Sequence, residues 1–133
     1  AAGGDPEKVR LSTPPVTTAA MVSHAYYQID RAHPVGFFGK VHVLEGTSTA
    51  LATLAAEKIQ SRLGLGADAM TYLTSHGSLD LEHVAFFETL MNQLGDAEDQ
   101  QAVVEMADAI YHLYGEMFRA LPQRDSHELF EVA

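Results

Sequence analysis

The sequence contains no cysteine and has few basic residues. Without cysteine there is no disulfide framework, no thiolate metal site and no cysteine nucleophile. Eight Lys and Arg residues stand against eighteen Asp and Glu residues, which gives a net charge of −10. No basic cluster is available to neutralise phosphates, so we expect no nucleic-acid partner. A chain without cysteine fits a reducing cytoplasm, and we expect a cytoplasmic location.

Long apolar runs are also missing. No stretch approaches the ~20 apolar residues that cross a bilayer, and no signal peptide is visible, so we expect no membrane partner. The chain of 133 residues is 47% hydrophobic, which is enough for one domain with a core.

What the sequence does contain is helical periodicity. Apolar residues recur at helical spacing and predict four long helices, over about 16–31, 34–63, 69–94 and, after a turn at 95–99, up to residue 121. Asp96 suits the N-cap of the last one, and "GLGAD" ends the second. Gly36, Gly39 and Gly46 inside the second helix indicate close approach to a neighbour, or a bend near Gly46.

No segment has the pattern of a strand. Residues 1–15 are predicted as a polar lead-in with no helical pattern, and residues 123–133 as a tail. Long helices with short connections favour an all-α antiparallel bundle, with residues 1–133 as a single helical domain.

Polar groups lie on the apolar stripe of the third predicted helix. At about 100° per residue, His76, Asp80, His83 and Phe87 fall within an arc of about 60°. We expect this helix to bury Phe86 and Phe87, and the stripe therefore predicts three inward ionisable groups. Because an unpaired buried carboxylate is costly, Asp80 needs a partner.

Glu45 is a single acid on the otherwise apolar face of the second predicted helix, followed by small residues. Two imidazoles and two carboxylates form a nitrogen and oxygen ligand set that suits iron or manganese. An alternative stays open, in which His76 and His83 hydrogen-bond Asp80 or the backbone and Glu45 pairs with a neighbouring side chain.

The other histidines are weaker candidates for metal ligands. Glu105 and His112 repeat a Glu-x6-His spacing, but they lie with Gln101, Asp108 and Glu116 on a polar side that we expect to face solvent. The remaining histidines are interpreted as surface or capping groups, with His42 the least certain because it lies about 60° from Glu45 around its helix. They are His24, His33, His42 and His127.

The segments "HVLEGTSTALA" and "HGSLDLEH" resemble the heme-oxygenase-like diiron oxidases and oxygenases, the iron-containing redox enzymes. In that family a glutamate precedes a helix with His-x3-Asp-x2-His by about thirty residues. The resemblance covers about residues 3–122 and implies a heme-oxygenase-like helical bundle. It also implies that the metal ligands are Glu45, His76, Asp80 and His83.

The family takes further ligands, a Glu-x6-His pair, from an earlier helix. The resemblance therefore implies that this chain corresponds to the C-terminal part of a larger domain. It further implies a homodimer, or a partner segment that supplies the missing helices. The expected cofactor is iron, as one or two ions, with manganese as the alternative.

The implied function is activation of O2 on a small organic acid or amine. The candidates for the pocket wall are Phe38, Tyr72, Phe87 and Tyr111, although core packing also explains each of them. Two rival functions stay open: a cofactor-independent enzyme of the thiaminase-like or pyrroloquinoline-quinone-synthase-like kind, and a non-catalytic helical interaction protein with a relict polar core.

Overall fold

The structure is a computed structural model that describes residues 3–121, except for the side chains of residues 76–82. All regular elements in this range are helices, which confirms the all-α prediction. They are α1 (Pro6–Arg10), α2 (Val16–Asp30), the 3-10 helix η1 (Pro34–Gly36), α3 (Phe37–Leu63), the 3-10 helix η2 (Ala67–Met70), α4 (Thr71–Met91) and α5 (Ala97–Arg119).

Local signals explain where the long helices begin and end. The Asp96 carboxylate accepts a hydrogen bond of 2.7 Å from the Glu98 amide and caps α5, as its sequence predicts. Gly64 ends α3 in the left-handed conformation, with φ of 63°, which glycine adopts without a steric penalty.

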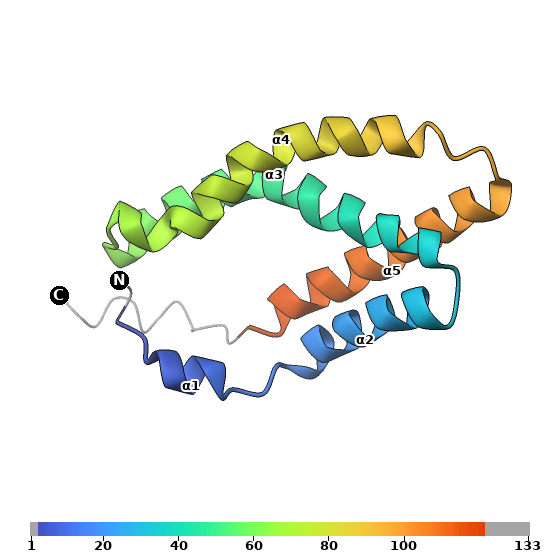
Figure 1. Ribbon diagram of the computed structural model, residues 1–133. Helices are drawn as coiled ribbons and strands as arrows, with labels where there is room; N and C mark the ends of the chain where they lie inside the picture. Colours follow the sequence, from blue (N-terminus) through green and yellow to red (C-terminus); the bar gives the residue numbers. More distant parts are fainter. Residues whose placement is uncertain (1–2, 122–133) are drawn as a thin grey trace.

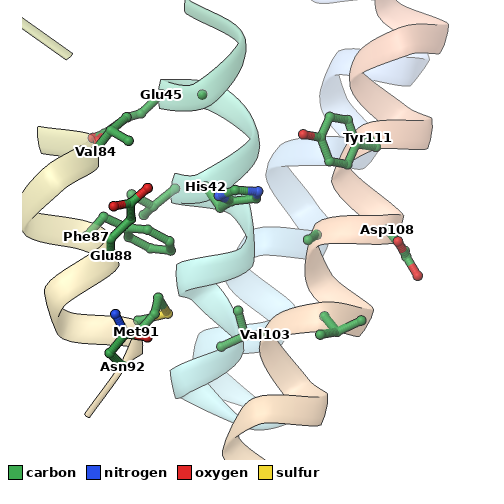
Figure 2. Close-up of a pocket in the computed structure, with 14 residues that line it drawn as sticks. His42, Glu45, Val84, Phe87, Glu88, Met91, Asn92, Val103, Asp108 and Tyr111 are labelled. Atoms are coloured by element: carbon green, nitrogen blue, oxygen red, sulfur yellow. The ribbon is translucent and has the colours of Figure 1, made fainter. Parts of the chain in front are cut away.

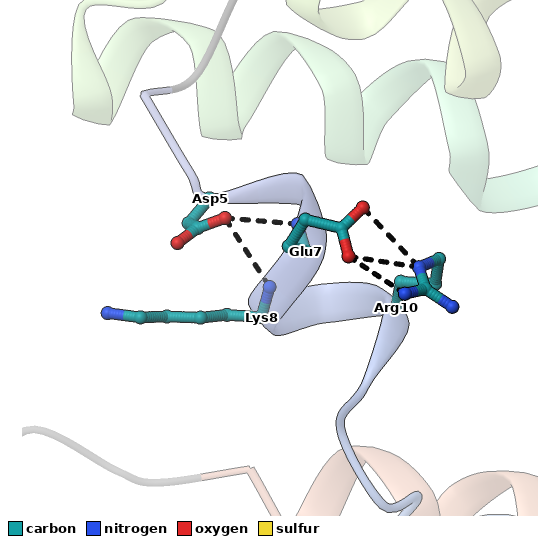
Figure 3. A network of polar contacts seen from close by, with 4 residues as sticks. All are labelled: Asp5, Glu7, Lys8 and Arg10. Carbon is teal, nitrogen blue, oxygen red and sulfur yellow. Dashed lines mark hydrogen bonds and ion pairs between the residues drawn. The ribbon is translucent and has the colours of Figure 1, made fainter.

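The prediction of a lead-in without helical pattern was wrong for residues 6–10, which form α1. Asp5 accepts hydrogen bonds from the amides of Glu7 and Lys8, and Glu7 pairs with Arg10 at 2.8 Å (Figure 3). Five residues are too few to show an apolar period, so side-chain caps define this helix instead.

The core joins α2, the first half of α3 and α5. Its buried members are Met21, Ala25, Val43, Met106 and Ile110. Val43, Met106 and Ile110 are the largest fully buried side chains, and burial of each contributes about 1.5–3 kcal/mol. This cluster holds three helices together at one end of the molecule.

The close approach predicted from the glycines is present at the start of α3. A Cβ atom at Gly39 would collide with the carbonyl oxygen of Val103 and lie 2.6 Å from the amide nitrogen of Ala107. A Cβ atom at Gly36 would lie 2.9 Å from the carbonyl oxygen of Ala102. The backbones of α3 and α5 therefore meet where no other residue would fit.

The four long helices form two pairs. Figure 1 shows α3 beside α4 along one side of the molecule and α2 beside α5 along the other. Helix α3 also packs against α5, whereas no Cα atom of α4 lies within 8 Å of a Cα atom of α5 among the described residues. Among the same residues, no helix is both long and apolar enough to cross a membrane.

Replacing Gly39 with alanine should lower the free energy of unfolding by about 1–3 kcal/mol, because the added methyl group has no room. Urea denaturation followed by circular dichroism measures this loss.

Gly46→Ala is the matched control on the same helix. No atom lies within 4 Å of a Cβ atom at Gly46, so alanine should raise the free energy of unfolding by about 0.5–1 kcal/mol through its better helix propensity. Equal destabilisation by the two variants would contradict the close contact between α3 and α5.

Candidate functional site

A groove of about 580 Å³ lies between α3, α4 and α5 (Figure 2). It exists because α4 packs on α3 without reaching α5 within the described residues. The residues that line it are Val41, His42, Glu45, Gly46, Val84, Phe87, Glu88, Met91, Asn92, Val103, Val104, Ala107, Asp108 and Tyr111. Most of this surface is apolar, and three of the polar side chains are carboxylates, those of Glu45, Glu88 and Asp108.

Helix α3 forms the floor of the groove and supplies two polar groups three residues apart. Figure 2 shows Glu45 reaching toward α4 and His42 projecting toward the side of α5. The Glu45 side chain is 32% exposed, and its Oε1 atom lies 3.9 Å from Nδ1 of His83 on α4. The His83 side chain is 60% exposed, so the prediction that it points inward was wrong. A contact between an imidazole and a carboxylate thus joins two helices at the edge of the groove.

This contact bears on the predicted ligand set. Bonds from a divalent ion such as zinc to nitrogen or oxygen are about 2.0–2.2 Å, so two ligands of one ion lie about 3–4 Å apart. The separation of Glu45 and His83 fits that range. The side chains of His76 and Asp80 lie outside the described residues. Among the side chains that are described, no three of the His, Asp and Glu type are grouped closely enough to hold an ion.

The four predicted pocket residues have different positions. Phe87 and Tyr111 line the groove. Phe38 does not line the groove, but its ring packs edge-on against the ring of Phe87, with centroids 6.2 Å apart. Tyr72 does not line the groove, because it belongs to the first turn of α4, about four turns before Phe87, and is 70% exposed.

The prediction that α4 buries both phenylalanines was wrong for Phe86, which is 69% exposed. Phe87 is half-buried and packs against the rings of Phe38 and His42 on α3. Adjacent residues on a helix point about 100° apart, so one narrow contact with α3 covers only one of the two rings.

His42 is a groove residue that the sequence left as a surface group. Its ring stacks on Phe87 with centroids 5.7 Å apart. Its position one turn before Glu45 was the available signal, since residues three apart share a helix face. The groove carboxylates Glu88 and Asp108 were also missed, because no pattern within one helix shows which neighbour it faces.

His33 has a partner that its sequence context did not show. Its Nε2 atom lies 3.2 Å from Oδ1 of Asp99 at the start of α5. The amide of Gln28 donates a hydrogen bond of 2.6 Å to the carbonyl of His33. These contacts hold the turn between α2 and α3 in place, so the role of His33 is structural.

The polar side of α5 is solvent-exposed, as predicted. Glu105 and His112 are both exposed, while Met106 and Ile110 on the opposite side are buried. Their Glu-x6-His spacing therefore belongs to the outer face of the helix.

A family model described as iron-containing redox enzyme matches residues 1–115, most of the chain. The chain therefore belongs to this heme-oxygenase-like family, and its all-helical structure agrees with that fold. The family description indicates a redox function that involves iron. No curated protein and no solved structure matched the chain.

Replacing Phe87 with alanine should loosen α4 from α3, because the ring supplies contacts to Phe38 and His42. Truncating a half-buried phenylalanine should cost about 2 kcal/mol, less than at a fully buried position. Amide hydrogen exchange should become faster in α4 and change little in α5, which does not touch α4 within the described residues.

Phe86→Ala is the matched control, since it removes the same ring from an exposed neighbouring position. It should change stability by no more than about 0.5 kcal/mol. Similar exchange rates in the two variants would show that Phe87 does not hold α4 in place.

Proposed function

We propose that this protein is a non-heme iron oxidase or oxygenase that activates O2 on a small organic molecule. The observation that carries the proposal is the 3.9 Å approach of Glu45 and His83 across α3 and α4, at the edge of a groove. Family membership supports iron in particular. Asp80 and His76, one and two turns earlier on α4 than His83, complete the proposed ligand set.

The residues present suit such an ion. Carboxylate oxygen and neutral imidazole nitrogen are ligands that iron and manganese both accept, and no thiolate exists to favour a softer metal. Bound iron would supply one-electron redox chemistry with O2. One or two iron ions, with manganese as the alternative, are part of the proposal.

The chain's own residues would position the substrate and limit water. Glu45 and His83 would hold the ion from two helices, so the site depends on the packing of α4 on α3. Val84 and Phe87 place apolar surface beside Glu45 and would limit water there, whereas the His83 side chain is 60% exposed. A cytoplasmic location belongs to the same proposal, because a reducing compartment suits ferrous iron.

Replacing His83 with alanine should weaken Fe(II) binding at least about 10-fold, because a direct ligand is lost. Anaerobic titration followed by desalting and elemental analysis measures the binding. His112→Ala on the outer face of α5 is the matched control and should bind iron like the original chain.

Equal affinity of the His83 and His112 variants would remove His83 from the ligand set. If the unaltered chain takes up neither iron nor manganese, a cofactor-independent enzyme or a non-catalytic helical protein becomes the better explanation. Circular dichroism of each variant separates loss of ligand from loss of fold.

We further propose that the chain self-associates as a homodimer through apolar side chains on α3. Leu51 and Leu54 are 57% and 47% exposed and lie one turn apart. Exposed apolar side chains on neighbouring turns are typical of contact surfaces.

Sedimentation velocity should show a dimer whose fraction rises with concentration. The double variant Leu51→Ser and Leu54→Ser should shift the population toward monomer, whereas Val9→Ser, at a 70% exposed position on α1, should not. A strictly monomeric original chain would refute the dimer.

A further inference from the structure

The groove has an apolar lining with acidic groups, one histidine and, among the described residues, no Lys or Arg. Its apolar surface comes from all three helices, for example Val41 on α3, Phe87 and Met91 on α4, and Val103 and Val104 on α5. Three carboxylates lie among these residues, on Glu45, Glu88 and Asp108, and the described lining residues include no Lys or Arg. A bound molecule would therefore meet apolar contacts and negative charge together.

The net charge of the whole chain is concentrated in the segment that supplies two helices of the groove. Residues 63–118 contain ten Asp or Glu residues and no Lys or Arg, while the rest of the chain contains eight of each kind. This segment includes all of α4 and nearly all of α5, which form the two walls of the groove. The segment that contains both walls thus carries the entire net charge, and its field attracts cations and repels anions.

The nearest basic side chain on the floor helix is directed elsewhere. The Nζ atom of Lys40 lies 5.0 Å from the ring centroid of Phe37, which packs against the core, and Lys40 does not line the groove. Lys40 therefore does not provide a partner for a carboxylate bound in the groove.

We propose that the groove binds an organic amine with an apolar chain, held by its ammonium group at Glu88 and by its chain against Phe87, Met91 and Val103. Figure 2 shows the Glu88 carboxylate beside Phe87, so a molecule lying along that ring can reach both. The assignment of this amine as the substrate rests on the proposed oxidase function. It narrows the expected substrate class from small organic acids and amines to amines alone.

Size and charge agree with this ligand class. A volume of about 580 Å³ lies within the usual range of small-molecule sites, and it has room for a chain of several carbons. An ammonium group at the Glu88 carboxylate gains a charge-assisted hydrogen bond. A carboxylate in the same place would face like charge and find no Lys or Arg partner among the described lining residues, which selects against organic acids.

Isothermal titration calorimetry of the whole chain with hexylamine, hexanol and hexanoate tests the proposal. The titrations are made with a chelator present, so that no metal contributes. Hexylamine should bind at least about 10-fold more tightly than hexanoate, with hexanol between them, because the three share a chain and differ in head-group charge. Hexanoate binding as tightly as hexylamine would overturn the proposal.

Two variants locate the site. Glu88→Gln keeps the shape of an exposed side chain and should weaken hexylamine about 5-fold, the size of a partly exposed ion pair, without affecting hexanol. Glu105→Gln, on the outer face of α5, is the matched control and should change nothing. Equal losses in both variants would mean that amines bind the acidic surface in general, which refutes the groove.

Val104→Trp adds bulk at a half-exposed position in the groove and should weaken hexylamine and hexanol alike. Unchanged binding of both would place them elsewhere and refute the proposal.

The test of amine binding can fail or succeed independently of the test of the proposed oxidase function. Amine binding is measured without metal, and iron uptake without amine. Amine binding with no iron uptake would leave the groove assignment standing and remove the oxidase, whereas iron uptake without amine preference would do the reverse.

Discussion

The contact between the backbones of α3 and α5 at Gly36 and Gly39 is the constraint on which the rest of the structure depends. It brings Val43 against Met106 and Ile110 and so creates the buried core. Because α3 is a single continuous helix of 27 residues, its position at this contact also directs the part that lies beyond. Helix α4 packs on α3 and is placed by it.

The groove follows from this arrangement. Glu45 lies six residues after Gly39, about 9 Å along the helix axis, where α3 faces both α4 and α5. Two walls that share a floor and do not touch each other within the described residues leave space between them. The candidate ligands and the apolar lining therefore occupy the same part of the molecule.

The negative charge around the groove determines which kind of molecule it favours. Acidic residues on both walls repel one another, which costs some stability in the compact state. A cation in the groove, whether a metal ion beside Glu45 and His83 or an ammonium group beside Glu88, relieves that repulsion. The charge of residues 63–118 and the family's use of iron point to the same kind of occupant.

The sequence by itself determined the four long helices, the cap at Asp96, the polar side of α5 and the family, because each depends on short-range periodicity or on spacing along one chain. Only the tertiary structure decided that Phe87 packs while Phe86 is exposed, that His33 meets Asp99, and that His42 stacks in the groove. These outcomes depend on which helix lies opposite, and that choice is made by contacts between residues far apart in sequence, such as Gly39 with Val103. Periodicity identifies the face of a helix, but the neighbour that covers it is set by packing.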